Sequence, residues 1–178
     1  VLSHAPRRVQ AAMMLVDAFQ PVGVTRLAVD SIFMMPHLGV LATVNREAAM
    51  QVFWRDCLVP LGTCIAPRGQ ARWGEPCMDV EVALRTGSQR LNLALGDIVR
   101  IELPAGESAR VTVQPTARFD CGAGRGRRLT ASVEGGEAGL IIDARGRPIV
   151  WPTTEERQRV VRRWLDAIGA YPGQPVGA

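Results

Sequence analysis

The densest group of residues that could bind a ligand is a glycine-rich stretch at residues 121–128, Cys-Gly-Ala-Gly-Arg-Gly-Arg-Arg. Glycine lacks a Cβ atom, so successive backbone N–H groups can turn toward one anion. Arginine adds forked donors that suit phosphate or carboxylate. The stretch lacks the Gly-Lys-Ser/Thr end of a P-loop, and a strand is expected after it where a dinucleotide fingerprint needs a helix. It is either an anion site or a flexible, solvated connection between strands. The residues assigned to the anion site are Gly122, Gly124, Arg125, Gly126 and Arg127.

The remaining polar side chains do not form a complete catalytic group. Asp143 begins Asp-Ala-Arg-Gly-Arg-Pro, residues 143–148, which has the composition of a turn. A catalytic role for it would need a base or a metal that the sequence does not offer. Ser3 and His4 have the types of a nucleophile and a base, but adjacent residues at a helix start point apart. We therefore predict no catalytic residues and no enzymatic activity in this chain.

The cysteines do not predict a metal site. They stand at positions 57, 64, 77 and 121, and no pair has the C-x₂₋₄-C spacing of a zinc site. We expect reduced cysteines, no metal and a cytoplasmic protein, since a chain of this length does not need disulfides. A cluster that also uses His4 or His37 is the alternative.

Composition and charge exclude several classes of protein. The chain has 178 residues, 47% of them apolar and 21% charged, with a net charge of +4, which argues against disorder. All of its 21 Lys or Arg residues are Arg. Basic residues outnumber acidic ones by 6 to 4 in residues 1–70, 11 to 10 in 71–147 and 4 to 3 in 148–178. This even spread lacks the basic stripe of a nucleic-acid-binding protein. No apolar run approaches the roughly 20 residues of a membrane-spanning helix, so we expect neither nucleic acid nor membrane as a partner.

The elements that would position these residues change from helical to β along the chain. In residues 1–60, Ser3 is a candidate N-cap, and apolar residues recur at helical spacing over residues 9–19. A short strand is predicted at 24–29, and a helical region follows. There Asn45 either caps a new helix or lies inside one long helix.

Residues 76–150 alternate between apolar and polar, as half-buried strands do, with turn residues between the runs. The continuous apolar run at 139–142 predicts a strand that is covered on both faces. A capping box from Thr153 to Glu156 begins a final helix, which packs on the β region or on the N-terminal helices. The apolar residues predicted to share one β core are Val80, Val82, Leu91, Leu93, Val111, Val113, Leu140 and Ile142.

Together these patterns predict an α+β fold with an N-terminal helical segment, an antiparallel β-barrel or sandwich, and a C-terminal helix. The expected divisions are residues 1–60 for the helical segment, 61–151 for the β domain, 152–170 for the C-terminal helix and 171–178 for a loose tail.

Several segments resemble the glutamate mutase L family, which is of the ATPase type and belongs to the hydantoinase branch of the actin/sugar-kinase/Hsp70 superfamily. Residues 1–6, Val-Leu-Ser-His-Ala-Pro, resemble its adenosine-facing turn, where a Gly-Gly pair precedes them. Residues 30–39 are similar to the entry into the last helix of the ATPase domain. The C-terminal extension of longer members is similar to residues 119–124, Phe-Asp-Cys-Gly-Ala-Gly, and to residues 139–148.

The resemblance implies that this chain is a C-terminal fragment whose residues 1–60 are the end of an ATPase lobe. Ser3 and His4 would then face the nucleotide edge, only in the parent protein. ATP and Mg²⁺ would be cofactors of that parent chain, and none is expected for the fragment. The implied function is that of a non-catalytic region of an ATP-dependent reactivating or assembly protein. Its implied partners are the upstream part of its own chain and a coenzyme B12-dependent mutase. The alternatives are an anion- or phosphate-binding β module and part of a hydantoinase-like amidohydrolase.

Overall fold

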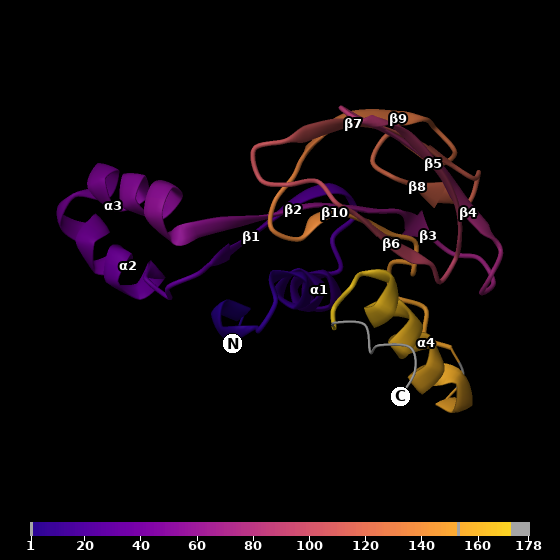
Figure 1. The fold of residues 1–178 in the computed structure, drawn as a ribbon, viewed down its shortest axis with the longest axis horizontal. Coiled ribbons are helices and arrows are strands. Elements are labelled where there is room, and N and C mark those ends of the chain that lie inside the picture. Colours follow the sequence, from indigo (N-terminus) through magenta and orange to yellow (C-terminus); the bar gives the residue numbers. More distant parts are fainter. Residues whose placement is uncertain (1, 153, 172–178) are drawn as a thin grey trace.

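The computed structural model describes residues 2–152 and 154–171 (Figure 1). Helices and strands occur in the predicted order, helical first and then β, with a helix at the end. The N-terminal elements are the 3₁₀ turn η1 (Leu2–His4), α1 (Arg8–Phe19), β1 (Gly23–Asp30), α2 (Met35–Val44), α3 (Arg46–Val52) and the π-helical turn η2 (Phe53–Cys57). The remaining elements are β2 (Leu58–Ala66), β3 (Arg68–Gly69), β4 (Pro76–Leu84), β5 (Gly87–Ala94), β6 (Ile98–Ile101), β7 (Ser108–Pro115), β8 (Phe119–Asp120), β9 (Leu129–Glu134), β10 (Gly139–Asp143) and α4 (Thr154–Ala167).

The strands form two facing four-stranded sheets. The first has the order β1-β2-β10-β6, with β2 and β10 parallel and the other neighbours antiparallel. The second has the order β5-β4-β7-β9 and is antiparallel throughout. The short strands β3 and β8 pair separately. The predicted α+β fold is thus confirmed, and the β architecture is a sandwich in which one sheet is mixed.

The interior of the sandwich is the predicted β core. Alternate residues of β4 and β7, such as Val82 and Val113, point toward the first sheet and pack against Leu140 and Ile142 of β10. Seven of the eight predicted core residues are buried here, and Leu91 is partly buried against the same cluster. All five residues of β10 are buried, which confirms the prediction of a strand covered on both faces.

Two helices cover the other face of the first sheet and make a third layer (Figure 1). Val16 of α1 and Trp164 of α4 belong to one apolar cluster with Leu61 of β2 and Ile141 of β10. The C-terminal helix therefore packs on both of its predicted partners, the N-terminal helix and the β region. Residue 60, the expected division between the first two segments, lies inside β2.

The first helix begins later than predicted. Its N-cap is Arg7, whose backbone N–H donates to Gln10 Oε1 at 3.3 Å, and Ser3 lies in the separate turn η1. The prediction of Ser3 as the N-cap was wrong, because four residues of turn and bend separate it from α1. The helix ends at Phe19, and the next residue, Gln20, adopts a left-handed conformation with φ of 44°.

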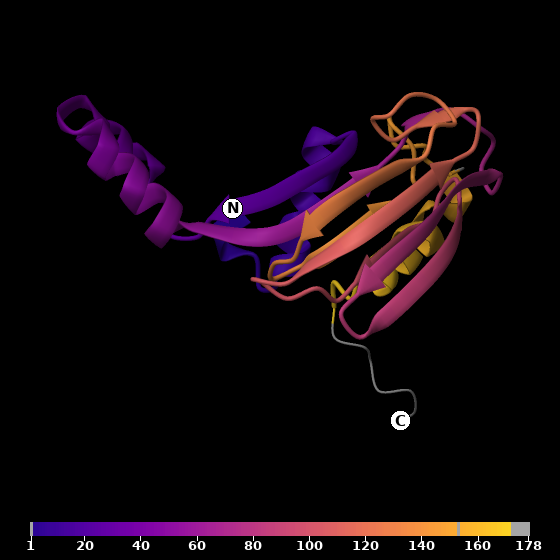
Figure 2. The ribbon, with the colours of Figure 1, turned by 90° about the horizontal axis from the view of Figure 1, so that it is seen from above.

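The hairpin of β1 and β2 carries a helical insertion, residues 31–57, which we call the arm. Figures 1 and 2 show α2 and α3 standing away from the sandwich at the end of this hairpin. Asn45 caps a new helix, the first of the two predicted alternatives, since its Oδ1 accepts the N–H of Ala48 at 3.0 Å. Helices α2 and α3 therefore pack as a short helical pair beyond the main core.

The buried and exposed faces of helix α4 are those predicted from the sequence. Val160 and Trp164 are buried, whereas Arg157, Arg159 and Arg163 are exposed. Gly169, with φ of 65°, follows its last turn. The predicted capping box depends on Thr153, which lies outside the described residues. In residues 2–152 and 154–171, no helix combines the length and the apolar character needed to cross a membrane.

Candidate functional site

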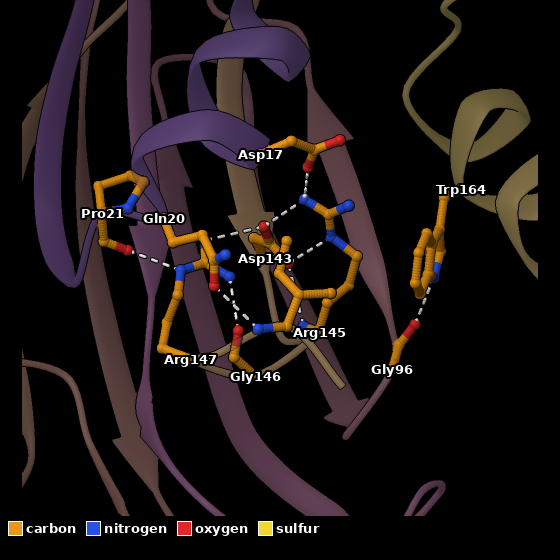
Figure 3. A network of polar contacts seen from close by, with 10 residues as sticks. Asp17, Gln20, Pro21, Gly96, Asp143, Arg145, Gly146, Arg147 and Trp164 are labelled. Carbon is orange, nitrogen blue, oxygen red and sulfur yellow. Dashed lines mark hydrogen bonds and ion pairs between the residues drawn. The ribbon is translucent and has the colours of Figure 1, made fainter. Parts of the chain in front are cut away.

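A buried network of charges is centred on residues 143–148, at the end of β10 and in the turn after it (Figure 3). Asp143 and Arg145 are fully buried, and Arg147 is 5% exposed. Asp143 ends β10, and the turn after it brings both arginines back to its carboxylate. The turn predicted at Asp143 is confirmed, since Asp143 Oδ1 accepts the backbone N–H of Arg145 at 3.0 Å.

The carboxylate of Asp143 is saturated with hydrogen bonds. Its Oδ1 also accepts Arg145 Nε at 2.9 Å, and its Oδ2 accepts Arg145 Nη2 at 2.8 Å and Arg147 Nη2 at 2.9 Å. Burial alone would raise the pKa of Asp143, but the two guanidinium groups outweigh it and lower that pKa below its ordinary value. A carboxylate that holds four donors and stays ionised is not available as a general base or acid.

The two arginines connect this turn to α1 and to the residues directly after α1. Arg145 Nη2 donates to Asp17 Oδ1 of α1 at 2.7 Å, and Arg147 Nε donates to the carbonyl oxygen of Pro21 at 2.8 Å. Gln20 Oε1 accepts the backbone N–H of Ile149 at 2.9 Å. The network thus connects residues about 130 positions apart in sequence, as Figure 3 shows. These contacts hold the end of β10, the turn after it and the end of α1 together.

An aromatic cluster adjoins the network. Trp164 lies 5.6 Å from Trp151 and 6.0 Å from Trp73, measured between ring centroids. Its indole N–H donates to the carbonyl oxygen of Gly96 at 2.7 Å, and a Cβ at Gly96 would meet the Trp73 ring at 2.6 Å. Sequence reasoning missed this cluster because these tryptophans are far apart along the chain.

The backbone N–H groups of the glycine-rich loop already bind a carboxylate of the protein itself. Asp120 Oδ1 accepts the N–H groups of Gly122 at 2.7 Å and of Gly124 at 2.9 Å. The N–H of Gly126 donates to the carbonyl oxygen of Phe119. A carboxylate of the protein thus occupies the place where an external anion was expected. The exposed side chains of Arg125 and Arg127 remain as donors for the predicted anion.

The predicted nucleotide-edge residues lie at the N-terminal end, in η1. His4 is exposed, and the side chain of Ser3 lies outside the described residues. The turn η1 contacts α1 and β1, whereas the glycine-rich loop follows β8, so the predicted site residues come from separate elements of the fold.

The four cysteines are free and buried. Burial raises the pKa values of Cys64, Cys77 and Cys121 to about 12, so these thiols stay protonated at neutral pH. Within the described part of the chain, no three His, Cys, Asp or Glu side chains are grouped closely enough to hold a metal ion.

The arm carries the most conspicuous exposed surface. Helix α2 contains no Asp, Glu, Lys or Arg, yet Val44 is 86% exposed and Val40 is 70% exposed. A groove of about 260 Å³ between α2 and α3 is lined only by apolar residues and glycine, among them Leu38 and Phe53. Large apolar side chains that are exposed together are typical of interaction sites, so this surface has the character of a docking site. The other large exposed apolar residues of the arm are Ile32, Phe33, Met35, Leu41, Met50 and Trp54.

A comparison of the chain with protein-family models finds no matching family, and comparisons with curated proteins and with solved structures find no match.

Proposed function

We propose that this chain is the non-catalytic C-terminal region of an ATP-dependent accessory protein that assembles or reactivates a coenzyme B12-dependent mutase. In this proposal the chain supplies binding surfaces, and an ATPase lobe upstream in the same polypeptide supplies ATP and Mg²⁺ binding. The protein is cytoplasmic, for which the four unpaired cysteines are support. The chain belongs to the glutamate mutase L family in this proposal, on the resemblance of residues 1–6, 30–39, 119–124 and 139–148.

The observation that carries the proposal is the apolar arm. Large apolar side chains exposed together on a projecting element are typical of protein interaction sites. The proposed occupant is the ATPase lobe of the parent chain, because residues 30–39, which lead into α2, resemble the entry into the last helix of such a lobe. Packing against the ATPase lobe would bury the apolar side chains of α2 that are exposed in this chain.

The buried charges fit the same proposal. Asp143, Arg145 and Arg147 are fully engaged in joining β10 to α1. Because the Asp143 carboxylate already accepts four donors from the turn after β10, the network supports a structural region rather than a hydantoinase-like amidohydrolase. An anion-binding β module has less support than an assembly region, since Asp120 already holds two N–H groups of the glycine-rich loop.

The experiment measures ATP turnover and recovery of an inactivated B12-dependent mutase from the same organism. Three samples are compared, namely this chain alone, the intact protein, and the intact protein with Val44→Asp. We expect no turnover by this chain alone, and turnover with recovery of the mutase by the intact protein. Val44→Asp should abolish both activities of the intact protein without changing the melting temperature of this chain alone, because Val44 is exposed there.

Met14→Asp is the matched control, since Met14 is also an exposed apolar residue on a helix but lies outside the arm. It should leave turnover and recovery unchanged. ATP hydrolysis by this chain alone, or an intact protein without ATP turnover, would contradict the proposal.

A further inference from the structure

Strand β1 is a long, open edge of the first sheet. It is the terminal strand in the order β1-β2-β10-β6, and β2 is its single partner among the described residues. Figure 2 shows the side of β1 that faces away from β2 without a covering element. An edge strand of eight residues presents a row of backbone N–H and C=O groups to a further strand.

The edge lacks two of the usual devices that prevent pairing, a proline and a bulge of its own. Natural edge strands are commonly interrupted by proline, by a bulge or by inward charges. β1 contains no proline. The irregularity in its ladder comes from β2, where Leu61 is the extra residue between Gly62, opposite Leu27, and Pro60, opposite Ala28. β1 itself is therefore continuous and can pair along its whole length.

A groove of about 220 Å³ runs beside this edge, between the end of α1 and β1. Phe19, at its rim, is 77% exposed although it is aromatic. The lining is mostly apolar, which suits a large aliphatic or aromatic side chain. The lining residues are Leu15, Phe19, Pro21, Thr25, Arg26, Leu27 and Ala28.

The charges of this surface are already used within the chain. Arg26 forms an ion pair with Glu134 of β9. Asp30 accepts the backbone N–H groups of Ile32 at 3.2 Å and Met35 at 3.0 Å. The charged side chains of β1 are thus paired within the chain, and β1 leads into the arm, whose helix α2 contains no Asp, Glu, Lys or Arg.

We propose that the open edge of β1 receives an extended, uncharged β-strand from the ATPase lobe, with one large apolar side chain of that strand in the groove at Phe19. The inference rests on the proposed function for the identity of the lobe. A strand fits because it alone satisfies the backbone groups of the edge while its alternate side chains enter a groove. A lipid surface would cover the apolar arm but would leave those N–H and C=O groups unsatisfied.

The test compares amide hydrogen exchange, residue by residue, in this chain alone and in the intact protein. The amides of Gly23–Asp30 that face away from β2 should exchange at least about 100-fold more slowly in the intact protein, because each becomes part of a sheet ladder. The amides on the outer edge of β5, the terminal strand of the second sheet, serve as the internal control and should not change.

Phe19→Glu in the intact protein should remove this protection, since a charge would enter the apolar groove. Tyr171→Glu is the matched control, because Tyr171 is an aromatic residue that is 59% exposed away from the groove, and it should keep the protection. ATP turnover is measured on the same samples. Unprotected β1 amides in an intact protein that hydrolyses ATP would overturn this inference and leave the proposed function standing. Protected amides without ATP turnover would overturn the proposed function and leave strand docking standing.

Discussion

The guanidinium carbon of Arg145 lies 4.9 Å from the centre of the Trp164 ring, and the two side chains are 0% and 2% exposed. A cation held over an aromatic face is attracted to its π electrons, most strongly where water is excluded. In the described part of the chain, Arg145 Nη1 is a buried atom without a hydrogen-bond partner. The attraction to the indole ring is thus a main contribution that offsets the missing hydrogen bond of Nη1. Through this contact the turn after β10 is joined to α4 as well as to α1.

The first prediction concerns Asp143. Asp143→Ala leaves Arg145 and Arg147 buried without their shared carboxylate, and loss of one partner of a buried ion pair costs about 3–5 kcal/mol. Denaturant unfolding should therefore show a loss of this size in the free energy of unfolding. Asp79→Ala is the control, because Asp79 is exposed and contacts Asn92, and it should change stability by less than about 0.5 kcal/mol. Equal effects of the two substitutions would contradict the structural role of the network.

Asp143 also predicts a pH dependence. Its pKa is lower in the folded protein than the usual carboxyl value, so the folded state favours the ionised form. The resulting stabilisation is fully present above the unfolded pKa of about 4 and is lost as the pH falls through the lower, folded pKa. Stability curves of the wild type and of Asp143→Asn should therefore converge below pH 4.

The second prediction concerns the contact of Gly96 with Trp73. Gly96 and Gly87 both have positive φ, 106° and 143°, but only at Gly96 would a Cβ meet another residue within 4 Å. Gly96→Ala should thus cost about 1–3 kcal/mol more than Gly87→Ala, the usual cost of overpacking. Thermal and denaturant unfolding of both variants measure this difference. A difference near zero would show that the Trp73 ring moves aside freely.

The third prediction concerns Asp120 and the glycine-rich loop. Hydrogen bonds from the N–H groups of Gly122 and Gly124 lower the pKa of Asp120, so its contribution to loop order is present above the unfolded pKa and lost as the pH falls through the folded pKa. Asp120→Ala should speed amide exchange at both glycines at neutral pH. It should also free these N–H groups for inorganic phosphate, detected as shifts of their NMR signals. Phosphate binding to the wild type with the same shifts would instead favour the loop as an anion site in its own right.

The fourth prediction concerns the β core. Leu93 is 6% exposed and lies within the sandwich. Leu93→Ala should lower the free energy of unfolding by about 2–5 kcal/mol, the range for large-to-small changes in a core. A measured loss below about 0.5 kcal/mol would show that Leu93 does not face the core.

The strands that could be predicted from the sequence have one buried face or, as in β10, form a continuous apolar run. In β4, Val80 and Val82 alternate with exposed or partly exposed Asp79 and Glu81, so the period of two is visible. β2 gives no such pattern, because residues 61–66 are all buried and Pro60 and Gly62 interrupt the run. It could therefore not be recognised, although it lies at the centre of the first sheet.

The candidate site, too, could be predicted only where its signals are local in the sequence. The turn at Asp143 could be predicted because its signals are local, within residues 143–148. The contacts with Asp17 and Trp164 could not, since no local pattern relates residues so distant in sequence. The hydrogen bonds between Asp120 and the glycine-rich loop were missed for another reason. Asp120 stands directly beside the loop, and an Asx-type contact to N–H groups two and four residues later was a signal that could have found it.

The layer formed by α1 and α4 has a consequence for the order of folding. Arg7 Nη1 donates to the carbonyl oxygen of Gly169, and Gln10 Nε2 donates to that of Ala170, across 162 and 160 positions. During synthesis the strands β4, β5 and β7 can pair soon after they leave the ribosome, because their partners are close in sequence. The apolar side of α1 can pack on β1 and β2 early, but its remaining contacts form only after β10 and α4 have been made. A nascent chain thus carries a partly covered helix until α4 has been made, and during that interval it depends most on molecular chaperones.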